Sequence, residues 1–357
     1  MARDREIVEA VVRDEHRGPS PELRAALDEW PGLHYWASRA DAGRLVLVRA
    51  LAPAPRERWW IHIALFAATF VTVWMGGALL LGVTTSTLDW IGGGFYVPPA
   101  AIVAWMKQNQ GGLSFAMALM GILLSHEMGH YFAAKRYGIS ASLPYFLPAP
   151  IELNFFGTFG AFIRLRSPVV DRRQLMDIGA AGPWAGFVVA LLMLGIGLQR
   201  SFPITGSEVD AAMIVSIGRN QLVLGDSLLT YWLRAMIVGG GVVELHPLAV
   251  AGWGGLLITS LNLFPLGQLD GGHILYALLS DRQRYIGMLA WIGLVVLGWW
   301  FKPWWIWAGL ALVLGGGRLA HPRVLERRRP LPKWRWAVGW ASIALFVLSF
   351  SPIPILI

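Results

Sequence analysis

The chain contains no cysteine among its 357 residues, and only 15% of its residues are charged. The absence of cysteine excludes disulfide bonds and thiolate metal sites, so histidine and carboxylate side chains must hold any metal ion. A soluble protein of this length carries about 25% charged residues. With 55% hydrophobic residues and a mean hydropathy of +0.52, the composition indicates a polytopic α-helical membrane protein.

The formal net charge of +8 is compatible with nucleic-acid binding or with basic loops on the cytoplasmic side of a membrane. Cytoplasmic loops of membrane proteins carry an excess of Lys and Arg, and short basic loops separate the apolar runs here. Residues 1–58 are polar, but their charges from Arg3 to Arg24 roughly cancel. We therefore expect no nucleic-acid partner. We expect a small cytoplasmic N-terminal region with a helix near Pro21–Trp30 and a strand at Leu45–Leu51.

Apolar runs predict about seven transmembrane helices. The basic loops fall on one side if the N-terminus is cytoplasmic, which places the C-terminus outside. No signal or transit peptide follows Met1, which favours a bacterial cytoplasmic (inner) membrane. Three regions are expected: 1–58, a membrane-embedded core at 59–280, and C-terminal transmembrane helices at 281–357. The predicted spans are about Trp59–Leu81, Gly111–Tyr137, Leu175–Leu198, Pro247–Phe264, Tyr285–Phe301, Trp304–Leu314 and Trp336–Phe350. Gly82–Gln110 is compatible with an interfacial or a re-entrant segment.

The second apolar run carries His126, Glu127 and His130 in the order HExxH. Positions 126 and 130 share one face of a helix, so two imidazoles can point at one metal ion. Glu127 lies about 100° round the helix, near enough to hold an attacking water. Ionised groups in such a run cost a few kcal/mol in lipid, which favours a functional site. Because short patterns also occur by chance, the motif alone leaves a coincidental match open.

A third ligand is needed, since a catalytic zinc takes three protein ligands plus water. Asp270 is the remaining acid in an apolar stretch, and it follows a break at Pro265 and Gly267. Broken backbone at membrane depth is tolerated only against protein or a wet cavity, where a carboxylate can bend inward. The alternative is an interfacial turn in which Asp270 caps a helix starting at Gly272. The DGG sequence alone does not decide between them.

HExxH followed by NxxPxxxxDGG resembles the site-2 protease family of intramembrane zinc metalloproteases. The resemblance runs from about Trp59 to about Ser280, and it includes GTFG at Gly157–Gly160 and AGPWAG at Ala181–Gly186. The pattern is most like bacterial and plastid-type members, without the inserted PDZ domain or the CBS pair of other branches.

The resemblance implies roles for matching positions. His126, His130 and Asp270 would hold one Zn²⁺ per chain, Glu127 would be the general base, and Asn262 would hold the substrate carbonyl or the developing oxyanion. The expected partners are a single-span membrane-protein substrate and the lipid bilayer. His246 and His273 receive no role from the family, and His273 is expected to pack at a helix start or to donate to a ligand.

The proline-broken segment at 139–166 is predicted to be extended backbone. By the resemblance, Gly157, Thr158, Phe159 and Gly160 would take up an unwound substrate strand by edge pairing. An ordinary cytoplasmic loop is the alternative for this segment.

Two other functions stay open. A metal-ion transporter could use the same four side chains, although no internal repeat and no second broken helix accompany them. A catalytically silent scaffold could keep the fold, although all the expected ligands and the base are present.

Overall fold

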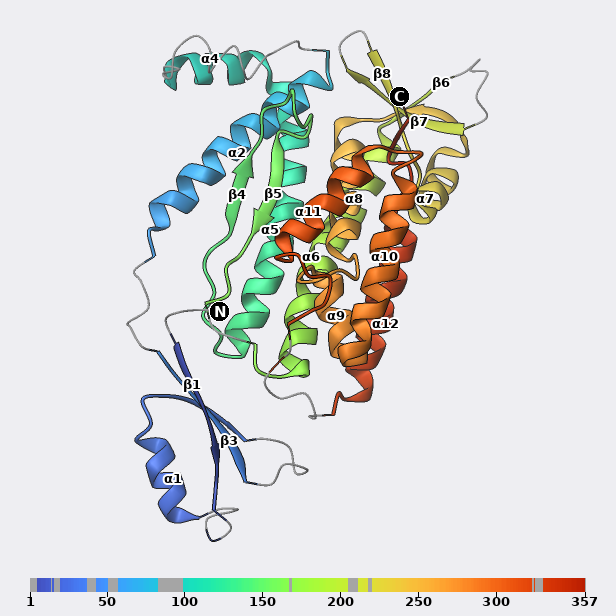
Figure 1. Ribbon diagram of the computed structural model, residues 1–357. Coiled ribbons are helices and arrows are strands. Elements are labelled where there is room, and N and C mark those ends of the chain that lie inside the picture. The colour runs from blue at the N-terminus through green and yellow to red at the C-terminus, as the bar shows by residue number, and fades with distance from the viewer. Residues whose placement is uncertain are drawn as a thin grey trace.

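The computed structural model describes residues 5–13, 15, 20–36, 43–50, 57–82, 99–166, 169–204, 211–217, 220–322, 324 and 330–356. A bundle of helices forms the centre of the molecule (Figure 1). A small N-terminal unit lies at one end of the bundle, and a five-stranded sheet lies at the other.

The N-terminal unit consists of an antiparallel sheet and one helix. Its elements are β1 (Arg5–Val11), α1 (Pro21–Asp28), β2 (Gly32–Trp36) and β3 (Arg44–Ala50), with strand order β1-β3-β2. The hydroxyl of Ser20 caps α1 by accepting from the amide of Leu23, and Pro21 occupies the first turn, where its missing N–H costs nothing. The predicted helix and strand are both present, and β1 and β2 are additional. The division of the chain at residues 58 and 280 stays a prediction.

Three helices in the described part of the chain are long and apolar enough to cross a membrane. They are α2 (Trp59–Leu79), the continuous segment formed by η3 (Gln110–Gly112) and α5 (Leu113–Arg136), and α6 (Arg172–Gln199). Their bounds lie within a few residues of the first three predicted spans.

The later predicted spans correspond to helices of fewer than 18 residues. These are α8 (Pro247–Asn262), α10 (Gln283–Leu297), α11 (Pro303–Leu314) and α12 (Lys333–Ser349). The 12 residues of α11 rise about 18 Å, less than the roughly 30 Å of a bilayer core. The mostly helical architecture is confirmed, whereas the number of seven spans stays a prediction. Of the segment at 82–110, α4 (Pro99–Gln108) is described, and the choice between interfacial and re-entrant falls mostly on residues beyond the described ranges.

The extended segment after α5 forms a hairpin of β4 (Tyr145–Pro148) and β5 (Thr158–Phe162), continued by a bridge between Ala141 and Leu165. The hairpin lies between α2 and α5, with β5 next to α5 (Figure 1). Extended backbone was expected here, because the prolines exclude a helix.

Two side chains of α2 fasten this hairpin. The buried His62 hydrogen-bonds through Nδ1 to the carbonyl of Pro144 at 3.0 Å, and the hydroxyl of Thr72 donates to the carbonyl of Gly157 at 2.6 Å. Gly157 has φ +74°, and a Cβ added there would lie 2.1 Å from the carbonyl oxygen of Thr72. Position 157 therefore needs glycine for its approach to α2.

The five-stranded sheet has the order β10-β8-β7-β9-β6, and all its pairs are antiparallel except β7 with β9. Its strands are β6 (Phe202–Ile204), β7 (Ala211–Ile217), β8 (Asn220–Leu224), β9 (Gly241–Glu244) and β10 (Ile355–Leu356). Helix α7 (Leu228–Val238) lies between β8 and β9 in the chain. No strand of this sheet was predicted from the sequence.

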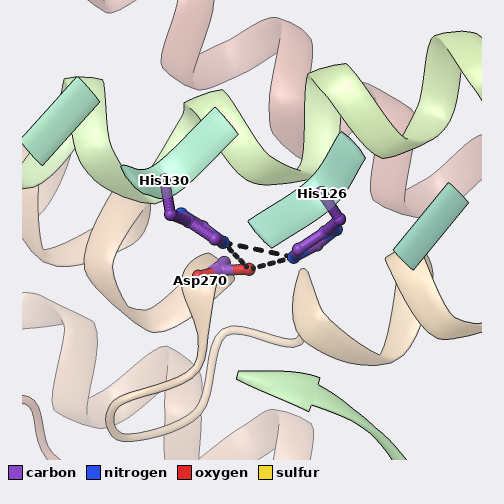
Figure 2. Close-up of side chains that lie close together, drawn as sticks. All are labelled: His126, His130 and Asp270. Carbon is purple, nitrogen blue, oxygen red and sulfur yellow. Dashed lines mark hydrogen bonds and ion pairs between the residues drawn. The ribbon is translucent and has the colours of Figure 1, made fainter. Parts of the chain in front are cut away.

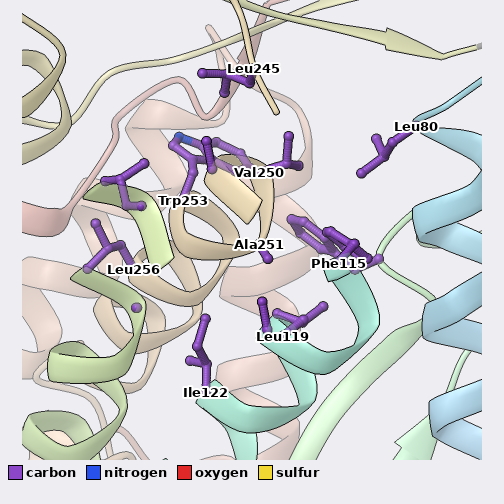
Figure 3. Packing of buried hydrophobic residues seen from close by; sticks show 14 of the residues in the cluster. Leu80, Phe115, Leu119, Ile122, Leu245, Val250, Ala251, Trp253 and Leu256 are labelled. Carbon is purple, nitrogen blue, oxygen red and sulfur yellow. The ribbon is translucent and has the colours of Figure 1, made fainter. Parts of the chain in front are cut away.

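The core lies where α5, α6 and α8 pack together. Phe115, Leu119 and Ile122 of α5 face Val250 and Trp253 of α8 in one buried cluster (Figure 3). Glycines let these helices approach closely. A Cβ at Gly129 of α5 would lie 2.4 Å from the carbonyl of Ala181 on α6, and one at Gly252 of α8 would lie 2.4 Å from the amide of Leu194 on α6. The helix that carries HExxH is thus packed tightly against α6.

Candidate metal centre

Three side chains from two distant parts of the chain meet beside α5 (Figure 2). His126 and His130 lie one turn apart on α5, and Asp270 is the first residue of α9 (Asp270–Leu279). The Nε2 atoms of the two histidines are 3.2 Å apart, and each lies 3.2 Å from Oδ2 of Asp270. Both histidines are buried. The arrangement presents three donor atoms to one point.

Asp270 reaches this point because the chain turns sharply between α8 and α9. Gly267 has φ +47° in the loop at 263–269, in the left-handed region that glycine tolerates best. A Cβ at Gly271 would lie 1.8 Å from the carbonyl of Leu263, so the glycine after Asp270 is required by the same turn. The N-cap of α9 is Leu269, and the Asp270 carboxylate faces the histidines. Asp270 therefore does not cap a helix beginning at Gly272, which was the alternative.

The protonation of His130 follows from its second nitrogen. Its Nδ1 lies 2.7 Å from the carbonyl oxygen of Ile178 on α6. A carbonyl only accepts hydrogen bonds, so Nδ1 carries the proton. Nε2 therefore has a free lone pair, which points toward the other two metal-ligand atoms, Nε2 of His126 and Oδ2 of Asp270. Metal-ligating histidines almost always have such a partner for the other nitrogen.

The glycines of the AGPWAG motif make space for the imidazoles. A Cβ at Gly182 would lie 2.1 Å from Nε2 of His130, and one at Gly186 would lie 3.1 Å from Nδ1 of His126. The structure shows that the space is filled by the two histidine rings.

The donor set fits zinc. Donor atoms about 2.0–2.1 Å from a tetrahedral zinc are separated by about 3.3–3.4 Å, close to the 3.2 Å found between each pair here. Two imidazoles and a carboxylate are also ligand types that zinc accepts, and three protein ligands leave a fourth position open.

Glu127 and Asn262 both lie at the edge of this centre. Glu127 is 6% exposed, and its carboxylate lies near the backbone of Ile163, directly after β5. Asn262 is the last residue of α8, and its Nδ2 lies 3.3 Å from Nε2 of His126. The structure thus brings the five predicted polar residues together.

The four residues at 157–160 have different surroundings. Gly157 packs against α2, and the buried Thr158 donates to the carbonyl of Leu147 and accepts from the amide of Gly160. Phe159 is 59% exposed, and no atom lies within 4 Å of a Cβ added at Gly160. Within the described residues, only β4 pairs with β5, so the other edge of β5 has no strand partner. Open surroundings are confined to Phe159 and Gly160.

Several contacts at the centre were not predicted. Ile163, Gln283 and His321 carry no motif, and their partners lie far away in the sequence. Of the two histidines without an assigned role, His246 caps α8, because its Nδ1 accepts from the amide of Leu248 at 3.2 Å. His273 contacts His321, with Nδ1 and Nε2 2.7 Å apart.

The geometry can be set beside known proteins. The model of peptidase family M50 matches residues 114–297, a stretch that contains both histidines, Glu127, Asn262 and Asp270. This chain belongs to peptidase family M50. The predicted resemblance to site-2 proteases is therefore confirmed.

Relatives of this M50 chain carry matching names. It is 33% identical over 249 residues to "Probable zinc metalloprotease EGY1, chloroplastic" of Arabidopsis thaliana, which covers 68% of this chain and 43% of the relative. It is 36% identical over 173 residues to "Probable zinc metalloprotease EGY2, chloroplastic" of the same plant, with 47% of this chain and 29% of the relative covered. The chain thus spans less than half the length of these relatives. No solved structure matches it.

Membership of the M50 family and the donor geometry indicate the same metal. The relatives are named as zinc metalloproteases, and the three donors fit zinc. Zinc is therefore the cofactor that this site is built to hold.

Proposed function

We propose that this M50 chain is an intramembrane zinc metalloprotease that hydrolyses a peptide bond within or near the transmembrane segment of a membrane-protein substrate. The observation that carries the proposal is the triangle of His126, His130 and Asp270, 3.2 Å on each side. Its two histidines lie on a helix long and apolar enough to cross a membrane. Buried ionisable groups at such a position are costly and mark functional sites.

His126, His130 and Asp270 would hold the zinc ion. When bound, zinc polarises the scissile carbonyl and lowers the pKa of a water at the open position toward about 7. Glu127 accepts the proton of the attacking water and delivers it to the leaving nitrogen. The backbone of Ile163 lies near the Glu127 carboxylate and would help to orient it for this transfer.

Asn262 would stabilise the charge that develops on the substrate. Its amide lies 3.3 Å from Nε2 of His126, beside the donor triangle. From there Nδ2 donates to the substrate carbonyl as negative charge builds on its oxygen. Removing one such donor typically costs about 3 kcal/mol of transition-state stabilisation.

The substrate would bind along β5. A transmembrane helix has every backbone group paired, so it must unwind before a protease can cut it. An unwound strand regains hydrogen bonds by pairing with a free sheet edge. The edge of β5 away from β4 lies on the side of α5 (Figure 1), and the residue after β5 contacts Glu127. Phe159 and Gly160 are the residues of the predicted loop that have room to contact a substrate.

The wider setting belongs to the same proposal. The partners are a single-span membrane protein and the lipid bilayer, and the chain crosses the bilayer about seven times with a cytoplasmic N-terminus. A bacterial inner membrane stays a prediction, since the relatives named above are chloroplastic by name.

The test compares the wild-type protein in detergent with Glu127→Ala. Zinc is measured by elemental analysis, and cleavage is measured on a generic single-span substrate. We expect about one zinc per chain in both proteins and cleavage about 10²- to 10⁴-fold slower in Glu127→Ala, the usual contribution of a general base.

The other outcomes separate the alternatives. Zinc in both proteins without cleavage by the wild type, over a panel of single-span substrates, would favour a silent scaffold. Absence of zinc from the wild type would exclude the metal site. Zinc flux into vesicles in place of cleavage would identify a transporter.

A further inference from the structure

Part of the connection between α11 and α12 lies close to the metal centre. Residues 318–322, here called the 318–322 turn, lie beside the 263–269 loop that leads to Asp270, and the amide of Gly267 donates to the carbonyl of Leu319 at 3.0 Å. The turn lies beyond residues 114–297, the part of the chain that the family model matches. It is a separate segment that supports a loop of the centre.

Gln283, the first residue of α10, joins the loop to the turn. Its side chain is buried, with 1% exposed. Its Nε2 lies 3.1 Å from the carbonyl of Pro265 and 3.3 Å from that of Leu319, while Oε1 accepts from the amide of His321 at 2.9 Å. Both N–H donors and the oxygen acceptor of the Gln283 amide are therefore used. One of the three hydrogen bonds goes to the 263–269 loop, and two go to the 318–322 turn.

Gly287, on the next turn of α10, leaves space for the contact between the 263–269 loop and the 318–322 turn. A Cβ at position 287 would lie 3.0 Å from the carbonyl of Pro265 and 3.2 Å from that of Leu319. Such contacts are tighter than side chains usually accept. The absence of a side chain at Gly287 therefore lets loop and turn meet.

A pair of histidines makes a second link. Nδ1 of His321 hydrogen-bonds to the carbonyl of Pro322, so it carries the proton. Burial lowers the pKa of His321 to about 4, which keeps the ring neutral and leaves Nε2 as an acceptor at neutral pH. Nδ1 of His273 therefore donates to Nε2 of His321 at 2.7 Å. The His321 ring also stacks on Tyr276 at 4.6 Å.

The second link acts on the helix that bears the ligand. His273 lies three residues after Asp270 on α9. The two links therefore hold both sides of Asp270: Gln283 holds the loop before it, and His273 holds the helical turn after it.

We propose that the 318–322 turn positions the metal ligand Asp270, with Gln283 and the His273–His321 pair as its two attachments. A ligand at the end of an irregular loop keeps its place only if neighbouring groups hold the loop, and displacements of about 1 Å impair metal sites. The inference rests on the proposed function, because it deepens the role of the same metal site.

The first experiment compares Gln283→Met with Gln268→Met in the full-length protein. Gln268 is exposed on the same loop, so it is the matched control. Zinc content, the rate of zinc loss to excess chelator, the unfolding temperature, kcat and KM are measured. We expect Gln283→Met to lose zinc at least about 10-fold faster and to have a lower kcat with KM unchanged, as is typical when a supporting residue of a metal site is removed. Gln268→Met should match the wild type.

If Gln283→Met fails to fold, a second variant tests whether the 318–322 turn positions Asp270. His321→Phe keeps an aromatic ring on Tyr276 but removes the acceptor for His273, and we expect faster zinc loss at an unfolding temperature close to that of the wild type. His321→Gln restores an acceptor and should slow zinc loss again.

The outcomes distinguish this inference from the proposed function. If the wild type binds zinc and cleaves, but the variants retain zinc at the wild-type rate, the turn has no positioning role, even where the unfolding temperature falls. If the wild type binds no zinc, the metal site itself is excluded, and the inference falls with it.

Discussion

At the scale of single residues, the metal centre depends on glycines as much as on its donors. HExxH places two imidazoles on one face of α5, but that face packs tightly against α6. Gly182 and Gly186 of α6 leave the volume that the rings of His130 and His126 occupy. A side chain at either position must move an imidazole.

Gly182→Ala should therefore lower zinc binding. Its Cβ would lie 2.1 Å from Nε2 of His130, the atom that faces the other donors. We expect zinc affinity to fall at least about 10-fold, because displacing a metal ligand should lower the affinity at least as much as removing a residue that hydrogen-bonds to a ligand. Competition with a chromogenic chelator would measure the affinity.

Gly195→Ala is the control for this change. Gly195 lies on the same helix, with no atom within 4 Å of an added Cβ, so alanine should leave zinc affinity unchanged. Equal affinities for the two variants would contradict the role given to Gly182.

The sequence predicted the polar residues of the centre, but not the contacts that hold them. HExxH has a helical spacing, and Asp270 follows a proline and a glycine in an apolar run. Both features are local. Ile163, Gln283 and His321 act through partners far away in the chain, and neither spacing nor composition indicates such partners.

At the scale of elements, the β4–β5 hairpin connects the first membrane helix with the helix of the metal centre. His62 and Thr72 attach it to α2, and Ile163 joins its far end to Glu127 on α5. Of the glycines once expected to admit a substrate, Gly157 serves the contact with α2 instead. Of the four residues at 157–160, only Phe159 and Gly160 have open surroundings that leave room for the proposed substrate.

Phe159→Ala should weaken substrate binding. The side chain is 59% exposed, so its removal should leave folding and zinc content unchanged. We expect KM for a single-span substrate to rise about 10- to 100-fold with little change in kcat, because about 1.5–3 kcal/mol of apolar burial would be lost.

Phe132→Ala is the matched control, since Phe132 is a similarly exposed phenylalanine on α5. An unchanged KM in Phe159→Ala, or an equal rise in both variants, would remove β5 as the substrate site.

The elements that the sequence predicted are those with a strong local pattern. The long apolar runs of α2, α5 and α6 and the extended backbone of the proline-broken segment were all expected. The sheet formed by β6 to β10 was not, because its strands are short and β7 pairs with β9 across α7. Helix α9 was expected only as an apolar piece after a break, and its role as the carrier of Asp270 depends on the turn before it.

At the scale of the whole molecule, the two ends of the bundle differ. At one end, Arg335 of α12 binds both carboxylate oxygens of Asp177 on α6 at 2.7 Å, and Tyr137 at the end of α5 joins them. The N-terminal unit lies toward this end, and the five-stranded sheet lies at the other (Figure 1). In the proposed membrane topology, these two ends face opposite compartments.

Single-cysteine variants can test the orientation, because each introduced thiol would be the only one in the chain. Ala26→Cys on α1 and Gln221→Cys on β8 lie at exposed positions near opposite ends. The basic loops favour a cytoplasmic N-terminus. A membrane-impermeant maleimide should therefore label Gln221→Cys in intact cells, and Ala26→Cys only after permeabilisation. The opposite pattern would invert the predicted topology.

The pairing of β10 with β8 also imposes an order on biogenesis. Ile355 pairs with Leu224, and helices α8 to α12 lie between these partners in the chain. Translation delivers β8 long before β10, so one edge of β8 stays uncovered until α12 has been inserted. A ribosome that stalls within α12 would leave a nascent chain whose metal-binding residues are all present and whose sheet is open. Until β10 has been made, β8 presents an unpaired edge with which a strand of another chain can pair, so delayed synthesis of this short strand exposes the chain to aggregation.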